Sequence, residues 1–425
     1  MTYQTAMEYM NQIGKKGSIL GLANVKELLR RLGDPQNQLS VIHVAGTNGK
    51  GSICTFLDCM YQAEGKRVGR YISPTLFTYL ERFQVNGKAM EEEEFTDIFA
   101  QIHKVLRDMQ REGKELPTAF EVETAVAFSY FVKEAVDIVI LETGMGGRED
   151  ATNVVDAPLC TVFASIGMDH MQFLGDTVEK IAYQKAGIIK KGSPVVSYPN
   201  IDTVCEVLCK EWRECNADAE LPAFQIADRS QITILEESLD GSRFCYKGEE
   251  YEISLAGDYQ IYNAVTAIET KLLLDGSLIK DSLKKAKWSA RFEKLADRPL
   301  MIRDGAHNID GVQALKISLE KHFTNTHIIF IIGILKDKEY EKMIATLCPM
   351  AAHIYTITPP VERGLSGEQL RADILPYCKD TIYCESVAKA CHCAGEVWEE
   401  YDRQGQSAVI VAWGSLSYMG LLGRN

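Results

Sequence analysis

A glycine-rich segment near residue 50 combines the residue types that bind phosphate. Residues 46–52 read Gly-Thr-Asn-Gly-Lys-Gly-Ser, directly after the apolar run at 40–45 and before a segment with a helical pattern. Glycines let backbone amides turn towards an anion, a helix start adds the positive end of a dipole, and Lys50 adds a charge. Ser52 supplies a hydroxyl that can bind Mg²⁺. The segment therefore predicts a phosphate-binding loop between a strand and a helix.

Three more polar side chains follow apolar runs that read as strands. They are Ser73, Glu142 and His170, after the runs at 68–72, 137–141 and 160–166. Ligands of open parallel sheets gather at the carboxyl ends of the strands, so we expect these side chains beside the phosphate loop. Together with Ser52 they form a mixed oxygen and nitrogen set that suits Mg²⁺ or Mn²⁺ bridging the phosphates of ATP. Singly, each has a structural explanation, such as an ion pair between Glu142 and Arg148.

Two further segments carry weaker signals. Residues 142–153 contain three glycines in four positions, which permits a close approach to a ligand, although a flexible loop without a ligand would look the same. Lys185 lies in a helical stretch that starts at Thr177. Its free ammonium would be repelled by a metal ion, whereas a carbamate formed with carbon dioxide is an anion that can bind one. Periodicity alone favours a surface lysine.

The elements that must position these residues alternate along the chain. Short buried runs separated by helical patterns predict an α/β fold with a doubly wound, mostly parallel sheet. Residues 229–256 predict an antiparallel hairpin attachment with its turn at Asp240-Gly241. Five more strand candidates start near residue 300. We therefore expect a P-loop domain over residues 1–290 and a smaller, Rossmann-like α/β domain over residues 291–425.

Composition limits the class of protein. The chain has 425 residues, a formal net charge of −13 and 46% hydrophobic residues, which is typical of a globular protein with two cores. An acidic chain is a poor candidate for broad nucleic-acid or membrane-surface binding. No apolar run is long enough to span a bilayer, and the first residues lack the pattern of a signal peptide. The 12 cysteines include no CxxC pair, so we expect reduced thiols and a cytoplasmic location. We expect a monomer, because both domains can bury their own cores.

Taken in order, the motifs resemble the folylpolyglutamate synthase and dihydrofolate synthase family of the Mur ligase superfamily. The match runs nearly end to end. It comprises LGLANVKELLRRLGDPQ before the phosphate loop, HVAGTNGKGS, YISPTLFTYLERFQVNG, LETGMGGREDATN, the MDH at 168–170, QKAGIIKKG, GDYQIYNAVTA at 257–267, ARFEKL at 290–295, DGAHNIDG at 304–311 and GILKDKEY at 333–340. The resemblance implies an ATP-dependent ligase in which a folate γ-carboxylate forms an acyl phosphate that L-glutamate then displaces.

The resemblance also implies roles for individual residues. Contacts to ATP would come from Asn48, Gly49, Lys50, Gly51, Ser52, Asn263, Arg291, Asp304 and His307. Two Mg²⁺ ions would be held by Ser52, Ser73, Glu142, His170 and a carbamylated Lys185. The pterin or acyl side of the substrate would meet Thr118, Phe120, Glu121 and Asp150. Lys50, Lys185 and His170 would take part in catalysis.

Some positions depart from the family pattern, and several features disfavour other classes of protein. The departures are Thr75, Tyr259, Ile309 and Lys336, of which Thr75 bears on the pteroate side. A muramyl-peptide ligase usually carries a whole domain before its phosphate loop, and only about 45 residues precede it here. A P-loop kinase or NTPase is disfavoured because the motif is not GxxxxGK[ST]. A non-catalytic relative would be expected to lack Lys50, Glu142 or His170.

Overall fold

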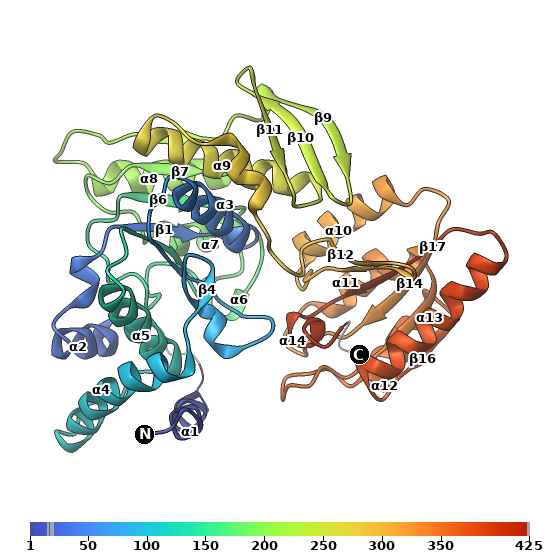
Figure 1. Cartoon of the computed structure of the whole chain (residues 1–425), viewed down its shortest axis with the longest axis horizontal. Coiled ribbons are helices and arrows are strands. Elements are labelled where there is room, and N and C mark those ends of the chain that lie inside the picture. Colours follow the sequence, from blue (N-terminus) through green and yellow to red (C-terminus); the bar gives the residue numbers. More distant parts are fainter. Residues whose placement is uncertain (15–16, 18–20, 423–425) are drawn as a thin grey trace. The chain divides into compact units, whose positions relative to one another are not determined.

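The chain consists of two compact units. The structure is a computed structural model that describes residues 1–14, 17 and 21–422 (Figure 1). Leu20, the first residue of the N-terminal motif, lies outside the described residues. Unit 1 comprises residues 1–231 and 262–285, and unit 2 comprises residues 232–261 and 286–425. The domain boundary predicted at residues 290 and 291 remains a prediction.

Unit 1 is built on one eight-stranded sheet whose order is β4-β3-β2-β5-β1-β6-β7-β8. The six parallel strands are β2 (Val68–Tyr71), β5 (Ile138–Glu142), β1 (Val41–Ala45), β6 (Cys160–Phe163), β7 (Val195–Ser197) and β8 (Phe224–Ile226). Strands β3 (Phe83–Val85) and β4 (Lys88–Ala89) add an antiparallel edge. Every residue of β1, β2, β5 and β6 is buried, as expected of parallel strands covered on both faces. The predicted doubly wound sheet is confirmed.

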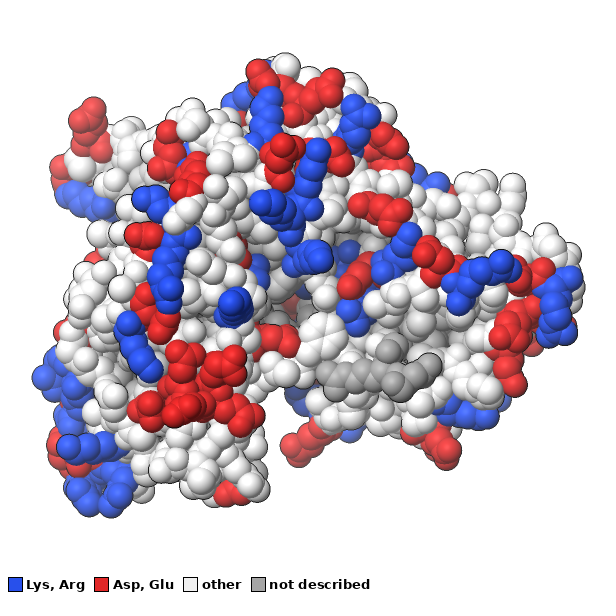
Figure 2. Space-filling model, viewed as in Figure 1, with Lys and Arg blue, Asp and Glu red and all other residues white. Residues whose placement is uncertain are grey.

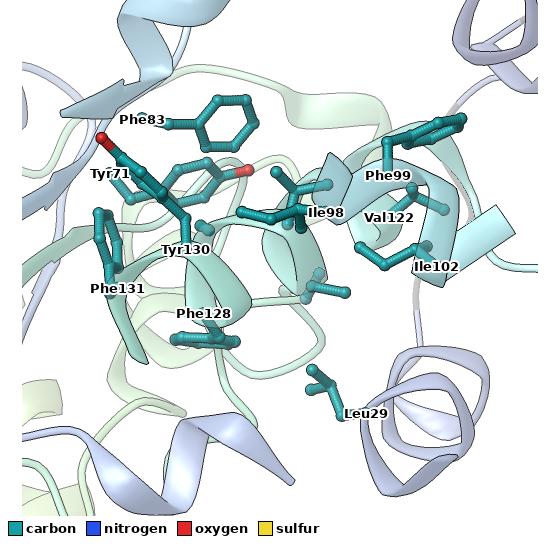
Figure 3. Packing of buried hydrophobic residues seen from close by; sticks show 14 of the residues in the cluster. Leu29, Tyr71, Phe83, Ile98, Phe99, Ile102, Val122, Phe128, Tyr130 and Phe131 are labelled. Atoms are coloured by element: carbon teal, nitrogen blue, oxygen red, sulfur yellow. The ribbon is translucent and has the colours of Figure 1, made fainter. Parts of the chain in front are cut away.

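The helices of unit 1 pack on this sheet and on one another. They are α1 (Tyr3–Gly14), α2 (Ala23–Arg31), α3 (Lys50–Ala63), α4 (Glu92–Arg111), α5 (Ala119–Lys133), α6 (Met171–Leu174), α7 (Val178–Ala186), α8 (Asp202–Cys215) and most of α9 (Asp258–Asp275). Helix α4 follows the predicted amphipathic pattern, with Phe95, Ile98, Phe99 and Ile102 buried. These residues join Tyr71, Phe83 and Phe131 in an apolar cluster, which Figure 3 shows in close-up.

Unit 2 contains a small antiparallel sheet and a second parallel sheet. The small sheet has three strands, β9 (Ile232–Ser238), β10 (Gly241–Tyr246) and β11 (Glu249–Ile253), and therefore extends the predicted hairpin by one strand. The larger sheet has the order β12-β13-β17-β14-β15-β16, made of Glu293–Asp297, Leu300–Arg303, Ala408–Trp413, His327–Ile332, Ala351–Thr356 and Thr381–Tyr383. Only β12 among these is antiparallel. The larger sheet matches the predicted second α/β series.

Five helices accompany the larger sheet of unit 2. They are α10 (Ile309–His322), α11 (Tyr340–Leu347), α12 (Gly367–Ile374), α13 (Val387–Arg403) and α14 (Leu416–Met419). Trp413 is fully buried at the end of the central strand β17, next to Phe330 of β14. No helix in the described part of the chain is long and apolar enough to cross a membrane. Acidic and basic side chains are interspersed over much of the face drawn in Figure 2.

Candidate functional site

The glycine-rich loop connects β1 to α3 and is hydrogen-bonded to the residues that follow the neighbouring strand β6. The backbone N–H groups of Thr47 and Asn48 donate to the carbonyl of Ser165 at 2.7 and 3.1 Å. The Thr47 hydroxyl donates to the carbonyl of Gly167 at 3.0 Å. Gly49 has a φ of +89°, which a residue with a side chain rarely adopts, and it directly precedes the first turn of α3. The predicted strand, loop and helix are all present.

Lys50 lies inside this loop and faces the end of β5. Its Nζ donates to the carbonyls of Gly46 and Thr47 at 3.2 and 3.4 Å, and it lies 3.8 Å from Oε1 of Glu142. Glu142 reaches this position because β5 pairs in parallel with β1, which places it beside Val44. Arg148, the alternative partner considered for Glu142, binds Glu211 at 2.6 Å.

Ser52 carries a hydroxyl that the fold buries without satisfying. The residue is 1% exposed in the first turn of α3, and its Oγ has no hydrogen-bond partner among the residues that the structure describes. A buried polar group without a partner costs about 1–3 kcal/mol. Because the hydroxyl lies in the phosphate loop, a bound ligand or cation is the group that would recover this cost. The donor set of Ser52 and Glu142 offers the oxygen atoms that Mg²⁺ prefers.

Lys185 is a buried lysine, so the surface position that periodicity favoured is wrong. It lies near the end of α7 and is 4% exposed. Its Nζ donates to the carbonyl of Gly46 at 2.8 Å, the same carbonyl that Lys50 contacts. Burial and then the neighbouring Lys50 lower the pKa of the Lys185 amine to about 7. Near neutral pH a large fraction of this amine is therefore uncharged.

The second glycine-rich loop, residues 142–153, packs tightly on α7. A Cβ atom at Gly147 would lie 2.5 Å from the carbonyl oxygen of Lys185, and one at Gly187 would lie 2.3 Å from Cα of Arg148. The N–H of Arg148 donates to the carbonyl of Gln184 at 2.7 Å. These glycines therefore permit a contact between two backbones of the same chain, and the contact holds Lys185 in place.

The other predicted metal ligands lie at the same edge of the sheet. Ser73 is half-buried after β2. His170 precedes α6 in a left-handed conformation with a φ of 49°, its side chain is 41% exposed, and its Nε2 lies 3.9 Å from Asp169. Within the described ranges, no three His, Cys, Asp or Glu side chains gather into a metal site. The predicted metal ligands include only two residues of these types, Glu142 and His170. Their roles as ligands therefore remain predictions.

The four acceptor-side candidates are built into the frame of unit 1. Thr118 and Glu121 form the capping box of α5, and Glu121 also accepts from the N–H of Val25. The Phe120 ring packs against Gly144, where a Cβ atom would lie 2.4 Å away. Asp150 is buried and accepts from three donors in its own loop, the N–H of Met145 and the N–H and hydroxyl of Thr152. Direct contact of these residues with a substrate remains a prediction.

Asn263 lies beside the phosphate loop within unit 1. Its Oδ1 would be 2.4 Å from a Cβ atom at Gly49, so the missing side chain of that glycine makes room for it. Asn263 is buried on α9. The structure thus brings Asn263 together with Lys50, Glu142 and Lys185.

In unit 2, three nucleotide-side candidates gather between β12, β13 and α10. The buried Asp304 accepts from the N–H groups of Phe292 and Ala306 at 2.7 and 2.8 Å. Burial raises the pKa of Asp304, while the nearby Arg291 opposes that shift. Nδ1 of His307 lies 2.7 Å from the carbonyl of Gly305. Asp304 and Arg291 are therefore close neighbours, and their contacts with a nucleotide remain predictions.

Arg148 and Thr47 support the site through contacts that the sequence did not predict. Arg148 joins the glycine-rich loop to α8 through Glu211, and its guanidinium lies 4.1 Å from the centroid of the Tyr183 ring. Thr47 exchanges two hydrogen bonds with the backbone of Gly167. No spacing in the sequence links these partners, because they lie on different elements.

Comparison with known proteins identifies the family. The Mur ligase middle domain matches residues 44–270, and the Mur ligase glutamate ligase domain matches residues 290–412. A dihydrofolate synthase/folylpolyglutamate synthase of Bacillus subtilis is 39% identical over 368 residues, which are 83% of this chain and 84% of the relative. The first family model covers the phosphate loop, and the second covers most of the C-terminal part of unit 2.

Solved structures agree with this result. Folylpolyglutamate synthase of Mycobacterium tuberculosis, complexed with ADP and AMPPCP, has a TM-score of 0.89 and 27% identity over 100% of this chain and 99% of that chain. E. coli FolC in complex with DHPP and ADP has a TM-score of 0.84 and 26% identity over 99% and 97%. The chain therefore belongs to the Mur ligase family, among the folylpolyglutamate and dihydrofolate synthases.

Proposed function

We propose that this chain is an ATP-dependent ligase that joins L-glutamate through an amide bond to the γ-carboxylate of a folate. The observation that carries the proposal is the convergence of Lys50 and Lys185 on the carbonyl of Gly46, beside Glu142. Such a cluster of charge in a phosphate loop suits the binding of a nucleotide triphosphate. The ligases that resemble this chain supply the direction of the reaction.

The chemistry requires two displacements. An oxygen of the folate carboxylate attacks the γ-phosphorus of ATP, the bond to ADP breaks, and an acyl phosphate forms. The amine of L-glutamate then attacks the acyl carbon, inorganic phosphate leaves, and the amine gives up a proton. Phosphoryl transfer depends on positioning and on neutralising charge rather than on a protein nucleophile. Lys50 and the amides at the start of α3 are suited to neutralising the β- and γ-phosphates.

Mg²⁺ fits the residues that the phosphate loop offers. The buried Ser52 hydroxyl and the Glu142 carboxylate are oxygen donors, and Ser73, His170 and a modified Lys185 would complete the ligands of two ions. When bound, Mg²⁺ neutralises the charge that develops on the phosphates. The nucleotide would also meet Asn48, Gly49 and Gly51 in the loop, Asn263 on α9, and Arg291, Asp304 and His307 in unit 2.

Lys185 is proposed to react with carbon dioxide. The uncharged amine attacks the carbon of carbon dioxide, a C–N bond forms, one C–O π pair moves to oxygen, and the nitrogen loses a proton to water. The product is a carbamate, which replaces a second cation next to Lys50 by an anion. Burial of the amine and its contact with the Gly46 carbonyl support this reaction, because they disfavour the protonated form.

Two acceptors are compatible with the family, and the pterin side of the substrate would meet Thr118, Phe120, Glu121 and Asp150. The Bacillus subtilis relative is named for both dihydrofolate synthase and folylpolyglutamate synthase activity. We therefore propose tetrahydrofolate as the first acceptor and dihydropteroate as a second one. A muramyl-peptide substrate is not favoured by the relatives found. We further propose a cytoplasmic location, which the twelve free cysteines support. We also propose a monomer, because each unit has an apolar core of its own.

The proposal is tested by following both products of the reaction. The full chain is incubated with ATP, Mg²⁺ and L-glutamate, and with tetrahydrofolate, dihydropteroate or no acceptor. We expect phosphate release only with an acceptor, and an acceptor mass that rises by one glutamyl residue. Addition to tetrahydrofolate alone would make the chain a dedicated folylpolyglutamate synthase. ATP hydrolysis without a longer folate would contradict the proposal.

A further inference from the structure

One buried carboxylate holds the segment after β2 against helix α5. Glu123 is 6% exposed; its Oε1 accepts from the Tyr79 hydroxyl at 3.1 Å and lies 2.5 Å from Nη1 of Arg82. Tyr79 and Arg82 are the first and last residues of the short 3-10 helix η2 (Tyr79–Arg82). The Arg82 guanidinium also lies 4.4 Å from the centroid of the Tyr79 ring. Glu123 therefore fixes both ends of η2.

A second carboxylate shapes the residues just before η2. The Glu81 side chain accepts from the backbone N–H groups of Leu76, Phe77 and Thr78 at 3.2, 3.2 and 2.9 Å. Thr78 and Glu81 also complete a capping box. The backbone of this turn is therefore fixed, while the ring of Phe77 is 43% exposed. Residues 73–82 form a firmly held turn that presents an aromatic side chain.

The place of this turn in the sheet relates it to the phosphate loop. In the order β2-β5-β1, strand β2 lies two strands from β1 and runs parallel to it. Residues after β2 and residues after β1 therefore share one edge of the sheet, about 10 Å apart. When the carboxylate of an acceptor substrate lies at the γ-phosphate of ATP, the remaining part of that substrate can reach this turn. Phe120, at the start of the helix that carries Glu123, packs on Tyr71 with ring centroids 5.9 Å apart.

The contact of Glu123 with Tyr79 and Arg82 places an ion pair beside apolar residues. The Tyr79 ring lies edge-on to Phe83 and Phe95, next to the apolar cluster of unit 1 (Figure 3 shows Phe83). Burial raises the pKa of Glu123, and its bonds to Arg82 and Tyr79 oppose that shift. Apolar residues of similar size would commonly stabilise such a contact as well as a buried ion pair does, whereas an ion pair with fixed geometry specifies one arrangement. The pair therefore points to a need for one conformation of the turn.

We propose that Glu123 is a positioning residue for the acceptor, which acts through Tyr79 and Arg82 to hold residues 73–82 in the conformation that receives an aromatic ring system. The inference rests on the ligase function proposed above and names a residue that governs how the pterin-bearing substrate is held. Its partners lie in η2 rather than in the phosphate loop. Loss of Glu123 should therefore weaken binding of the acceptor and leave the use of ATP and L-glutamate unchanged.

The test is a set of three variants assayed with each substrate varied in turn. Glu123→Gln keeps the shape and removes the charge; we expect the KM for tetrahydrofolate to rise about tenfold, with kcat and the KM for ATP within about twofold. Tyr79→Phe removes one hydroxyl and should raise the same KM about threefold. Glu134→Gln is the matched control, because Glu134 follows the same helix and pairs with the surface residue Arg67. It should change none of these constants.

The outcomes separate the inference from the proposed function. An unchanged acceptor KM in Glu123→Gln and Tyr79→Phe would overturn the inference while wild-type ligation continues. An equal loss for all substrates, with a lower melting temperature, would reduce Glu123 to a structural role and also overturn it. Should Glu123→Gln fail to fold, Tyr79→Phe decides by the same criterion. A wild-type chain that adds glutamate to no folate would overturn both proposals together.

Discussion

At the scale of single residues, the surroundings of Lys185 explain most about the site. Two lysine side chains donate to one backbone carbonyl, that of Gly46, and no apolar interior tolerates two such charges easily. The molecule lowers the pKa of Lys185 to about 7, chiefly by burial. Conversion to a carbamate would replace the repulsion from Lys50 by attraction. These surroundings therefore favour the proposed carbamate over an ammonium ion.

Removal of the Lys185 amine should abolish most of the activity. We expect Lys185→Ala to lower kcat about 100-fold or more, because a preorganised charge beside the transferred phosphate is lost. Lys185→Glu restores a carboxylate near the same place and should recover part of the loss. Turnover is measured at saturating ATP. A Lys185→Ala protein with wild-type turnover would refute the carbamate.

The same amine predicts how activity depends on pH. Because its pKa is about 7, acidification below that value protonates the amine, and an ammonium ion cannot attack carbon dioxide. In buffer with a low, fixed concentration of carbon dioxide, activity should therefore fall as the pH decreases from 8 to 6, and added bicarbonate should restore it. The comparison uses Lys185→Glu, which needs no carbon dioxide and should not respond. Equal responses of the two proteins to bicarbonate would contradict the carbamate.

Ser52 gives a prediction that separates a ligand contact from a structural one. Its buried hydroxyl has no partner in the described part of the chain, so Ser52→Ala should leave the stability unchanged or slightly raised. Activity should fall about 10- to 100-fold, with a higher requirement for Mg²⁺. Ser242→Ala is the control, because Ser242 on β10 is another buried serine whose Oγ lacks a partner in the described residues. Loss of activity in both variants would argue against a ligand at Ser52.

At the scale of elements, the contact between residues 142–153 and α7 decides where Lys185 lies. Gly147 and Gly187 let the two backbones approach within a distance that no side chain permits. Asn153 closes the contact by donating to the carbonyls of Arg148 and Gly187 at 2.9 and 3.1 Å. The glycines of this motif therefore position Lys185, and they affect a ligand only through Lys185.

A methyl group at this contact should separate the loop from the helix. Gly187→Ala places Cβ 2.3 Å from the Arg148 backbone, and we expect unfolding free energy to fall by about 1–3 kcal/mol, with activity lost as Lys185 moves. Gly395→Ala is the control on helix α13, where nothing lies within 4 Å, and it should stabilise the chain by about 0.5–1 kcal/mol. Urea unfolding measures both. Equal effects of the two substitutions would contradict the packing argument.

The sequence predicts the elements well and the environment of the site less well. The runs that became β1, β2, β5 and β6 are recognisable because buried parallel strands are continuously apolar. The phosphate loop is recognisable because its glycines, Lys50 and Ser52 lie together in one short segment of the sequence. The burial of Lys185 was not predictable from periodicity, since the atoms that cover it come from Gly46 and from the loop at Gly147, far away in the chain. The same holds for Arg148, whose partner Glu211 is on α8.

At the scale of the whole molecule, the chain passes between its two units three times. The crossings fall between residues 231 and 232, 261 and 262, and 285 and 286, so that the three-stranded sheet belongs to unit 2 although it precedes α9. Lys321 of α10 joins this sheet to its unit, because it pairs with Glu237 of β9 and, at 3.0 Å, with Asp258. Unit 2 is therefore built from residues that are distant from one another in the sequence.

Loss of Lys321 should weaken unit 2. Lys321→Met leaves two adjacent carboxylates, of which the Glu237 side chain is only 7% exposed, and we expect a destabilisation of about 1–2 kcal/mol at pH 7. Burial, and then Asp258, raise the pKa of Glu237, so protonation should make the loss smaller as the pH falls towards 4. Lys316→Met, on the same helix with an exposed pair to Glu320, should cost under about 0.5 kcal/mol. Thermal unfolding at both pH values checks this, and equal losses would contradict it.

The most direct measurement follows one oxygen atom through the reaction. Tetrahydrofolate labelled with oxygen-18 in its γ-carboxylate is incubated with the full chain, ATP, Mg²⁺ and L-glutamate. The masses of the folate product and of the released phosphate are then measured by mass spectrometry. Transfer through an acyl phosphate predicts a folate longer by one glutamyl residue and one labelled oxygen in the released phosphate. Unlabelled phosphate with a folate of unchanged mass would contradict the ligase that the geometry of Lys50, Glu142 and Lys185 supports.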